Sequence, residues 1–310
     1  MSTYLVTGAA GFIGGALAKR LVVDGNTVVT IDNLSTGFES NIPEGVVFIQ
    51  GDCGDAAVYE QLPDDQYDAI FHIAGQSSGE ISFDDPIYDI RTNAESTLLL
   101  LQFALKNQCT RLIYASTMSV YGAKPDQPVT ENERCTPESF YGVAKLASEH
   151  YLRIYEQYGI HSTALRLFNV YGPGQNLENL RQGMVSIFLS QMLENKHIHV
   201  KGSPDRFRDL IYIDDVVDAY IQTLNCKESW GQIINIATGK QTTVGDLVEK
   251  LIASQDDDVS VEYEGSTKGD IHGIYADISK MQSVLGIDNL VPVDAGLQKM
   301  VRWAITQQVS

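Results

Sequence analysis

The stretch Thr7-Gly8-Ala9-Ala10-Gly11-Phe12-Ile13-Gly14 follows a short apolar run and precedes a helical pattern. Glycines spaced in this way between a strand and a helix are typical of a parallel α/β sheet that holds a pyrophosphate at the helix start. Gly8 permits the tight turn, Gly11 lets the backbone approach the anion, and Gly14 lets helix and strand pack closely. The free N–H groups of the first helical turn would face the anion. The spacing is G-x-x-G-x-x-G rather than G-x-G-x-x-G. Glycines alone are weak evidence for a dinucleotide site, so the assignment depends on motifs in the rest of the chain.

The chain around this motif alternates between strand-like and helix-like patterns. Short β-branched apolar runs predict strands over residues 4–7, 27–31, 46–50, 69–73, 111–116 and 162–168. Helical periodicity is clearest over residues 13–24, 92–107 and 140–158. Such alternation indicates a parallel sheet with helices on both faces. We therefore predict an α/β fold built on a Rossmann-type doubly wound parallel sheet.

The alternation weakens after residue 168, where residues 169–174 read as a loop. Beyond this loop, helices are expected over 183–194, 215–224, 244–254 and 293–306, and strands over 198–201, 210–213 and 233–236. This change of pattern suggests two domains. Residues 1–168 with about 210–237 are expected to bind a dinucleotide. Residues 169–209 with about 238–310 are expected to form a smaller mixed α/β domain that binds the substrate.

The composition excludes several classes of protein. The 310 residues include 22 Lys+Arg and 40 Asp+Glu, a net charge of −18, which argues against a nucleic-acid or acidic-membrane binder. None of the four cysteines lies in CxxC spacing or beside a histidine that would complete a zinc pattern, so we expect reduced thiols and no metal. No apolar run of 18 residues and no basic leader segment occur. We therefore expect a cytoplasmic enzyme outside the membrane.

Two carboxylates identify the expected dinucleotide. Asp32 comes directly after the second predicted strand, 18 residues after Gly14. An acidic side chain there accepts hydrogen bonds from the adenosine ribose hydroxyls and repels a 2′-phosphate. Because residues 33–37 contain no Arg or Lys, we predict NAD rather than NADP. Asp52 and Cys53 follow the third strand and are expected at the adenine; the alternative for Asp52 is an Asx turn in residues 51–54.

A tyrosine and a lysine supply the expected acid–base chemistry. Tyr141 and Lys145 stand four residues apart in a predicted helix, so their side chains share one face. A neighbouring lysine and the positive nicotinamide of NAD would favour the phenolate, and a fall of the Tyr141 pKa from about 10 to about 7 would suit a base at neutral pH. Thr117 follows the predicted strand 111–116, at the sheet edge where ligands bind. Its hydroxyl could bond the same substrate oxygen as Tyr141.

Further motifs stand in a fixed order along the whole chain. They are TGAAGFIG (7–14), DNLSTG (32–37), GD (51–52), HIAG (72–75), STMSVYG (116–122), YGVAK (141–145), LRLFNVYGPGQ (165–175), RDLIYIDDV (208–216) and YADISK (275–280). In this order they resemble the extended short-chain dehydrogenases/reductases that act on sugar nucleotides. Within that group the resemblance is greatest to the UDP-glucose 4-epimerase-like, NAD-dependent epimerases.

The resemblance implies a function and a set of contacts. It implies epimerisation of a nucleotide sugar, by oxidation at C4 to a 4-keto sugar and return of the hydride, in a homodimer. Tyr141 would be the base, with Thr117 and Lys145 as its catalytic partners. The implied cofactor contacts are Gly8, Gly11, Phe12, Ile13, Gly14, Asp32, Asn33, Ser35, Thr36, Gly37, Asp52, Cys53, Ile73, Ala74, Gly75, Gln76, Asn93, Ser116, Tyr141, Lys145 and Phe168. The implied substrate contacts are Ser78, Thr117, Ser119, Tyr141, Asn169, Arg208 and Asp270.

Single positions depart from the family patterns. Met118 and Ser119 follow Thr117 where dehydratases carry an acidic pair and decarboxylases a Glu, which disfavours both reactions. Thr267 stands where the family carries a phosphate-binding Arg, and Ile274, near the C2 side of the sugar, leaves a 2-acetamido sugar open. Two alternatives to an epimerase remain. One is a nucleotide-sugar reductase or dehydrogenase, and the other is a catalytically silent NAD-binding regulator.

Three conspicuous features have structural explanations. His72 is expected to be a core histidine with satisfied hydrogen bonds. The pair Asp214-Asp215 is expected to cap the start of a helix. The leucines at 98–101 are expected to lie on a buried helix rather than along a ligand.

Overall fold

The computed structural model describes residues 1–124, 127–255, 258–265 and 272–308. Its centre is a seven-stranded parallel sheet in the order β11-β6-β5-β4-β1-β2-β3. The strands are β1 (Thr3–Thr7), β2 (Thr27–Asp32), β3 (Val47–Gln50), β4 (Ala69–His72), β5 (Arg111–Thr117), β6 (His161–Leu167) and β11 (Gln232–Ile236). The order reverses direction on either side of β1, as in a doubly wound fold. The predicted fold class is confirmed.

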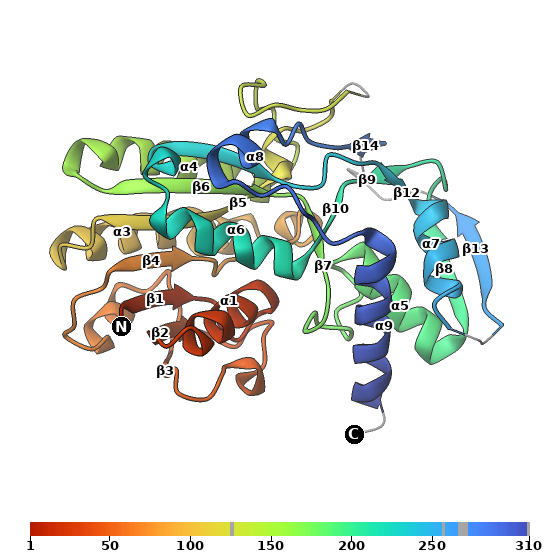
Figure 1. The fold of residues 1–310 in the computed structure, drawn as a ribbon, viewed down its shortest axis with the longest axis horizontal. Helices are drawn as coiled ribbons and strands as arrows, with labels where there is room; N and C mark the ends of the chain where they lie inside the picture. The colour runs from red at the N-terminus through yellow and green to blue at the C-terminus, as the bar shows by residue number, and fades with distance from the viewer. Residues whose placement is uncertain (125–126, 256–257, 266–271, 309–310) are drawn as a thin grey trace.

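Helices cover both faces of this sheet (Figure 1). One face packs on α1 (Phe12–Val23) and α6 (Ile213–Asn225), and the other on α3 (Ser96–Lys106) and α4 (Phe140–Tyr155). Alternate strand residues enter the two cores: Ile113 packs on the α1 side and Leu112 on the α3 side. Because both faces are buried, the strands read as nearly continuous apolar runs.

A second group of elements lies beside the sheet, on the right in Figure 1. Its helices are α5 (Met184–Asn195), α7 (Val244–Ile252) and α9 (Val293–Gln308), and β8 (His197–Lys201) pairs with β13 (Ser260–Glu264). Smaller sheets join this group to the central one: β7 (Asn169–Tyr171) pairs with β10 (Leu210–Tyr212), and β9 (Phe207–Arg208) pairs with β12 (Thr242–Thr243) and β14 (Gly273–Ile274). Helix α8 (Ser279–Leu285) follows β14.

The structure corrects several expectations. Residues 169–174 are not a loop throughout, because β7 forms there by pairing with the distant β10. The helix expected over 92–107 is preceded by α2 (Pro86–Ile90), and a π-helical turn over Arg91–Glu95 joins α2 to α3. The pair Asp214-Asp215 does not cap α6 as expected, because the N-cap of this helix is Tyr212. Asp215 instead accepts a hydrogen bond from Val291 N at 3.0 Å.

Two of the structural explanations are confirmed. His72 is fully buried, its Nδ1 lies 2.9 Å from Thr7 Oγ1, and burial lowers its pKa to about 3, so the ring is neutral. The leucines at 98–101 lie on α3, where Leu100 and Leu101 are fully buried. In the part of the chain that the structure describes, no helix is long and apolar enough to cross a membrane.

Candidate active site

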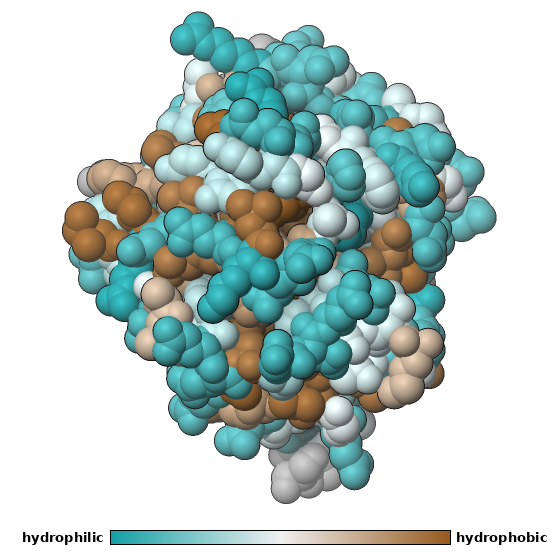
Figure 2. All heavy atoms as spheres, turned by 90° about the vertical axis from the view of Figure 1, so that its left-hand side faces the viewer, coloured by the Kyte–Doolittle hydropathy of each residue, from teal (hydrophilic) through white to brown (hydrophobic). Residues whose placement is uncertain are grey.

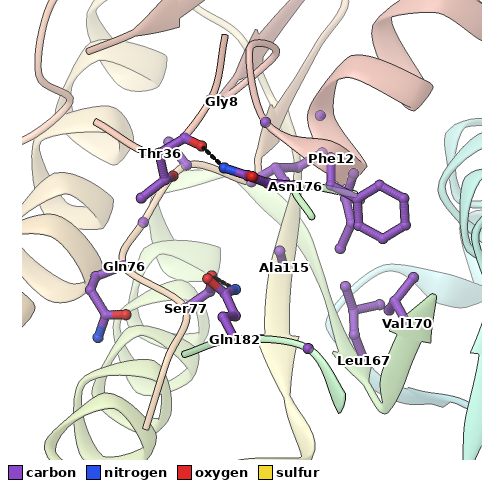
Figure 3. A pocket seen from close by; sticks show the side chains of 18 of the residues that line it. Gly8, Phe12, Thr36, Gln76, Ser77, Ala115, Leu167, Val170, Asn176 and Gln182 are labelled. Carbon is purple, nitrogen blue, oxygen red and sulfur yellow. Dashed lines mark hydrogen bonds between the residues drawn. The ribbon is translucent and has the colours of Figure 1, made fainter. Parts of the chain in front are cut away.

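A cavity of about 520 Å³ lies along the carboxyl ends of β1, β2, β3, β4, β5 and β6 (Figure 3). Every predicted cofactor residue except Asn93 lines it. Of the predicted substrate residues, four line it: Thr117, Ser119, Tyr141 and Asn169. The parallel topology thus brings together motifs that are more than 160 residues apart in the chain, from Gly8 to Asn169.

The glycine turn between β1 and α1 forms one end of the cavity. Gly8 has a φ of +82°, and a Cβ atom there would lie 2.9 Å from Ala74 N. A Cβ on Gly14 would lie 2.1 Å from Gly8 O, so helix and turn can only pack this closely around a glycine. No side chain caps α1 at Gly11, which leaves the N–H groups of its first turn directed toward the cavity. This geometry suits an anion at the helix start.

Carboxylates follow the next two strands along the same wall. Asp32 accepts hydrogen bonds from Ala10 N (2.9 Å) and Leu34 N (2.8 Å), one on each oxygen, so each oxygen keeps a lone pair for a ligand. Asp52 accepts from Gly54 N at 2.7 Å and from Asn33 Nδ2 at 3.3 Å. Asp52 therefore forms the Asx turn and also lines the cavity beside Cys53.

Three polar side chains meet deeper in the cavity. Thr117 ends β5, while Tyr141 and Lys145 lie one turn apart on α4, and all three are buried. Helix α4 begins at the N-cap Ser139, whose Oγ accepts from Gly142 N at 3.1 Å. Lys145 Nζ donates to Ala115 O at 3.0 Å and lies 5.9 Å from the centre of the Tyr141 ring.

The electrostatics of this group disfavour the phenolate in the chain without NAD. Burial raises the pKa of Tyr141 to about 12, and the Thr117 hydroxyl only partly opposes this rise. Burial also lowers the pKa of Lys145 to about 8, against the opposing charge of Asp89. In the chain without NAD the pKa of Tyr141 is therefore raised, because desolvation outweighs the hydrogen bond from Thr117. The fall expected with the positive nicotinamide bound stays a prediction. A further positive charge is needed to favour the phenolate.

A buried polar network supports the loop that follows β4. Asp89 Oδ1 accepts from Gln76 Nε2 at 2.8 Å and from Asn93 Nδ2 at 3.2 Å, and Asn93 Nδ2 also donates to Gln76 O at 2.9 Å. The backbone oxygen of Asn93 accepts from Ser148 Oγ on α4 at 2.8 Å. Asn93 thus lies behind the cavity wall and ties α4 to the π-helical turn, rather than lining the cavity.

Other predicted substrate residues lie outside this cavity. Ser78 is buried and bonds to Gln76 and Ile81 N in its own loop, and its Oγ donates to Arg181 O at 3.4 Å. Arg208 is buried and its Nη1 donates to Phe207 O at 2.7 Å. Ile274 is 2% exposed and packs in a small core with Phe168. Asp270, with Thr267, lies outside the described residues.

The sequence reasoning missed a wall of the cavity. Residues 174–185 contribute a run of amide side chains, among them Asn176, Asn179 and Gln182. Asn176 Nδ2 donates to Thr36 O at 3.4 Å, and Gln182 Nε2 donates to Ser77 Oγ (Figure 3). These bonds join the segment to two loops of the central sheet. The only sequence signal was an unusual density of Asn and Gln between two glycines.

Together, the fold and this cavity define a dinucleotide-dependent enzyme with a tyrosine–lysine pair beside the dinucleotide turn. Residues 4–237 match the model of the NAD dependent epimerase/dehydratase family. The chain belongs to this family, which confirms the resemblance found in its motifs, its nature as an enzyme, and NAD as its cofactor.

Individual relatives cover nearly the whole chain. It is 32% identical over 306 residues to a UDP-glucose 4-epimerase of Mycolicibacterium smegmatis, covering 96% of this chain and 97% of that protein. The crystal structure of Thermotoga maritima UDP-glucose 4-epimerase with UDP-glucose is similar, with a TM-score of 0.92, 32% identity and 99% of both chains covered. So is the UDP-N-acetylglucosamine 4-epimerase of Methanobrevibacter ruminantium, with a TM-score of 0.92 and 30% identity, covering 99% and 98%.

Proposed function

We propose that this protein is an NAD-dependent epimerase of a nucleotide sugar, acting at C4 of a UDP-hexose or UDP-N-acetylhexosamine. The observation that carries the proposal is the common cavity of the glycine turn and the group Thr117, Tyr141 and Lys145. The reaction would oxidise C4 to a ketone and return the hydride to the other face of the sugar. The similar proteins named as 4-epimerases of UDP-glucose and UDP-N-acetylglucosamine support both the carbon and the substrate class.

The residues of the cavity fit NAD. The cradle has no room for a side chain at Gly8 or Gly14, and a Cβ on Gly11 would lie only 3.2 Å from Gly8 O, which suits close approach of a pyrophosphate to the backbone. Asp32 stands at the end of β2, where a carboxylate would hold the adenosine ribose and repel a 2′-phosphate. NAD, when bound, supplies the hydride acceptor and the positive charge that Tyr141 lacks in the chain alone.

The chain's own residues would move the proton. Tyr141 would take the proton of the C4 hydroxyl on its phenolic oxygen and give it back when the hydride returns. Lys145 would hold a positive charge near that oxygen, and Thr117 would orient the hydroxyl through a hydrogen bond. Because the pKa of Tyr141 is about 12 in the chain alone, the base becomes effective only with cofactor bound.

The sugar nucleotide would lie between the central sheet and the second group of elements. Ser119 and Asn169 line the cavity on this side and would contact the sugar diphosphate. We retain Ser78, Arg208 and Asp270 as proposed substrate contacts. In this arrangement residues 1–168 with about 210–237 bind NAD, and residues 169–209 with about 238–310 cover the substrate.

A panel of nucleotide sugars, incubated with the purified protein without added cofactor, tests the function. Ion-exchange chromatography of the products should resolve the 4-epimer of one UDP-sugar. Turnover only with added NADH or NADPH would instead indicate the reductase or dehydrogenase. No reaction across the panel would favour the NAD-binding regulator and contradict the proposal.

We also propose a homodimer in the cytoplasm. Apolar side chains are exposed on α2 and α4, at Ile87, Ile90, Phe140, Val143 and Ile154. Figure 2 shows hydrophobic side chains between hydrophilic ones on the side of the molecule where α3 and α4 end. Light scattering at micromolar concentration should give twice the 34.1 kDa chain mass. A mass of one chain would contradict the dimer.

A further inference from the structure

A buried ion pair lies behind the active-site wall and plays no part in the mechanism described so far. Arg166, on β6, donates from Nε to Glu149 Oε1 at 2.9 Å and from Nη2 to Glu149 Oε2 at 2.7 Å. Both side chains are almost completely buried, at 3% and 2% exposure. Ser116 Oγ, on β5, donates to the same Oε1 at 2.5 Å. We call Ser116, Glu149 and Arg166 the carboxylate brace.

The brace joins the elements that carry the candidate catalytic residues. Ser116 directly precedes Thr117 at the end of β5. Glu149 lies on α4 one turn beyond Lys145 and two turns beyond Tyr141, on the same face of the helix. The carboxylate therefore fixes the end of β5 against the face of α4 that enters the active site.

The remaining contacts of Arg166 hold the brace in one geometry. Arg166 Nη1 donates to Glu131 O at 3.3 Å, and the guanidinium lies 4.7 Å from the centre of the Tyr121 ring. The Tyr121 hydroxyl in turn donates to Asn235 Oδ1 at 2.6 Å. Each guanidinium nitrogen thus has an acceptor, and the ring covers its face.

A stabilising role alone explains this arrangement poorly. Burying two charges requires their desolvation, and well-packed apolar side chains of similar volume often stabilise a protein as well or better. What a fully satisfied buried network does provide is a fixed geometry among the elements that it joins. In this protein those elements are β5, β6 and α4.

We propose that the carboxylate brace is a positioning device, which sets the distance between Thr117 on β5 and Tyr141 on α4. The proposal rests on the proposed function only in taking these two residues as catalytic. Reacting groups need close alignment, and a misplacement of about 1 Å can lower turnover about 100-fold. The brace would act through this alignment without touching the substrate.

The opposite end of the same two strands offers a matched control. Arg111 starts β5, is also buried, and donates from Nη2 to Ser229 Oγ at 3.1 Å and to Thr163 Oγ1 on β6 at 2.8 Å. Ser116→Ala and Ser229→Ala each remove one buried hydroxyl that bonds a charged group. Only the first lies beside a catalytic residue. Glu149→Asp provides a second test, because it keeps the charge but shortens the reach.

Kinetics and thermal unfolding separate positioning from stability. We expect Ser116→Ala to lower kcat tenfold or more. Ser229→Ala should keep kcat within twofold at a comparable loss of melting temperature. Glu149→Asp, at a residue that does not line the active-site cavity, should lower kcat like Ser116→Ala while KM and the content of bound NAD stay within twofold of the unmodified enzyme. Unchanged kcat in Ser116→Ala, or equal losses of kcat in the two serine variants, would overturn the proposal.

Crystal structures give a readout that needs no turnover. In Ser116→Ala the distance between Thr117 Oγ1 and Tyr141 Oη should change relative to the unmodified protein, and in Ser229→Ala it should not. An unchanged distance in Ser116→Ala refutes the brace even if the protein proves to be no epimerase. A changed distance in a protein that epimerises nothing would leave the brace in place and refute the proposed function alone.

Discussion

Replacing Lys145 by methionine should stabilise the folded protein near pH 7 while it reduces turnover. Burial lowers the pKa of Lys145 to about 8 from an ordinary value of 10.5. Below pH 8 the folded chain therefore carries a charge that the unfolded chain solvates better. The methionine side chain, similar in length and apolar, removes this unfavourable charge.

The size of the effect follows from the two pKa values. A difference of about 2.5 between them corresponds to about 3 kcal/mol, at about 1.4 kcal/mol for each pH unit. Loss of the bond from Lys145 Nζ to Ala115 O offsets this by about 1–2 kcal/mol. The net gain at pH 7 is then about 1–2 kcal/mol. This penalty is fully present below pH 8. It disappears as the pH rises from 8 toward 10.5, because in this range the folded chain has released the proton of Lys145 while the unfolded chain still holds it.

Urea unfolding of NAD-stripped protein at several pH values measures this difference. Between pH 8 and pH 9.5 the unfolding free energy of the unmodified protein should rise by about 2 kcal/mol relative to Lys145→Met. Lys19, exposed on α1, provides the control, and the difference between Lys19→Met and the unmodified protein should not change over this range. A constant difference for Lys145→Met would refute the reasoning that burial sets its pKa.

Three further predictions concern the proposed active site. Tyr141→Phe should lower turnover at least 1000-fold while NAD remains bound, as measured by product chromatography and the absorbance of the released cofactor; near-normal turnover would remove Tyr141 as the base. Gly14→Ala should lower both the melting temperature and the NAD content, because its Cβ would lie 2.1 Å from Gly8 O; Gly245→Ala, whose Cβ would make only an ordinary contact at 3.4 Å, should change neither. Asp32→Asn should reduce the preference for NAD over NADP about tenfold in binding titrations, and an unchanged preference would show that another residue excludes the 2′-phosphate.

Patterns within single segments of the sequence predicted most of the central sheet, the glycine turn and the tyrosine–lysine pair. Gly14 is constrained by Gly8 O within a single strand–turn–helix unit, and Gly8 by its own positive φ, so their spacing carries the information. The contact of Gly8 with Ala74, after β4, is not part of that local signal. Tyr141 and Lys145 share a helix face because residues four apart lie one turn apart in any α-helix. Strands buried on both faces need long apolar runs, which the sequence shows directly.

The remainder depends on contacts between distant segments. Strand β7 forms because Asn169 pairs with Leu210 on β10, and nothing in the sequence around either residue predicts this pairing. Strand β13 has almost no apolar face, since four of its five residues are exposed. The raised pKa of Tyr141 results from burial by the whole fold, which a helical spacing cannot reveal. The amides of residues 174–185 were missed for the same reason, because loops carry no periodicity.

The two neutral hydrogen bonds from Asn176 and Gln182 bear on how long a molecule stays in the cavity. Each such bond contributes about 1 kcal/mol net, so breaking both to separate the walls slows escape about 30-fold. Since neither bond involves a charge, their contribution to the residence time should depend little on ionic strength. The exposed ion pair between Arg181 and Asp84 (2.8 Å) joins the same segment to the loop after β4, and its contribution should fall as salt is added. A cofactor held between these walls would stay bound through many catalytic cycles before it exchanges with the pool outside, and only the part of its retention that depends on the ion pair would be lost in salt.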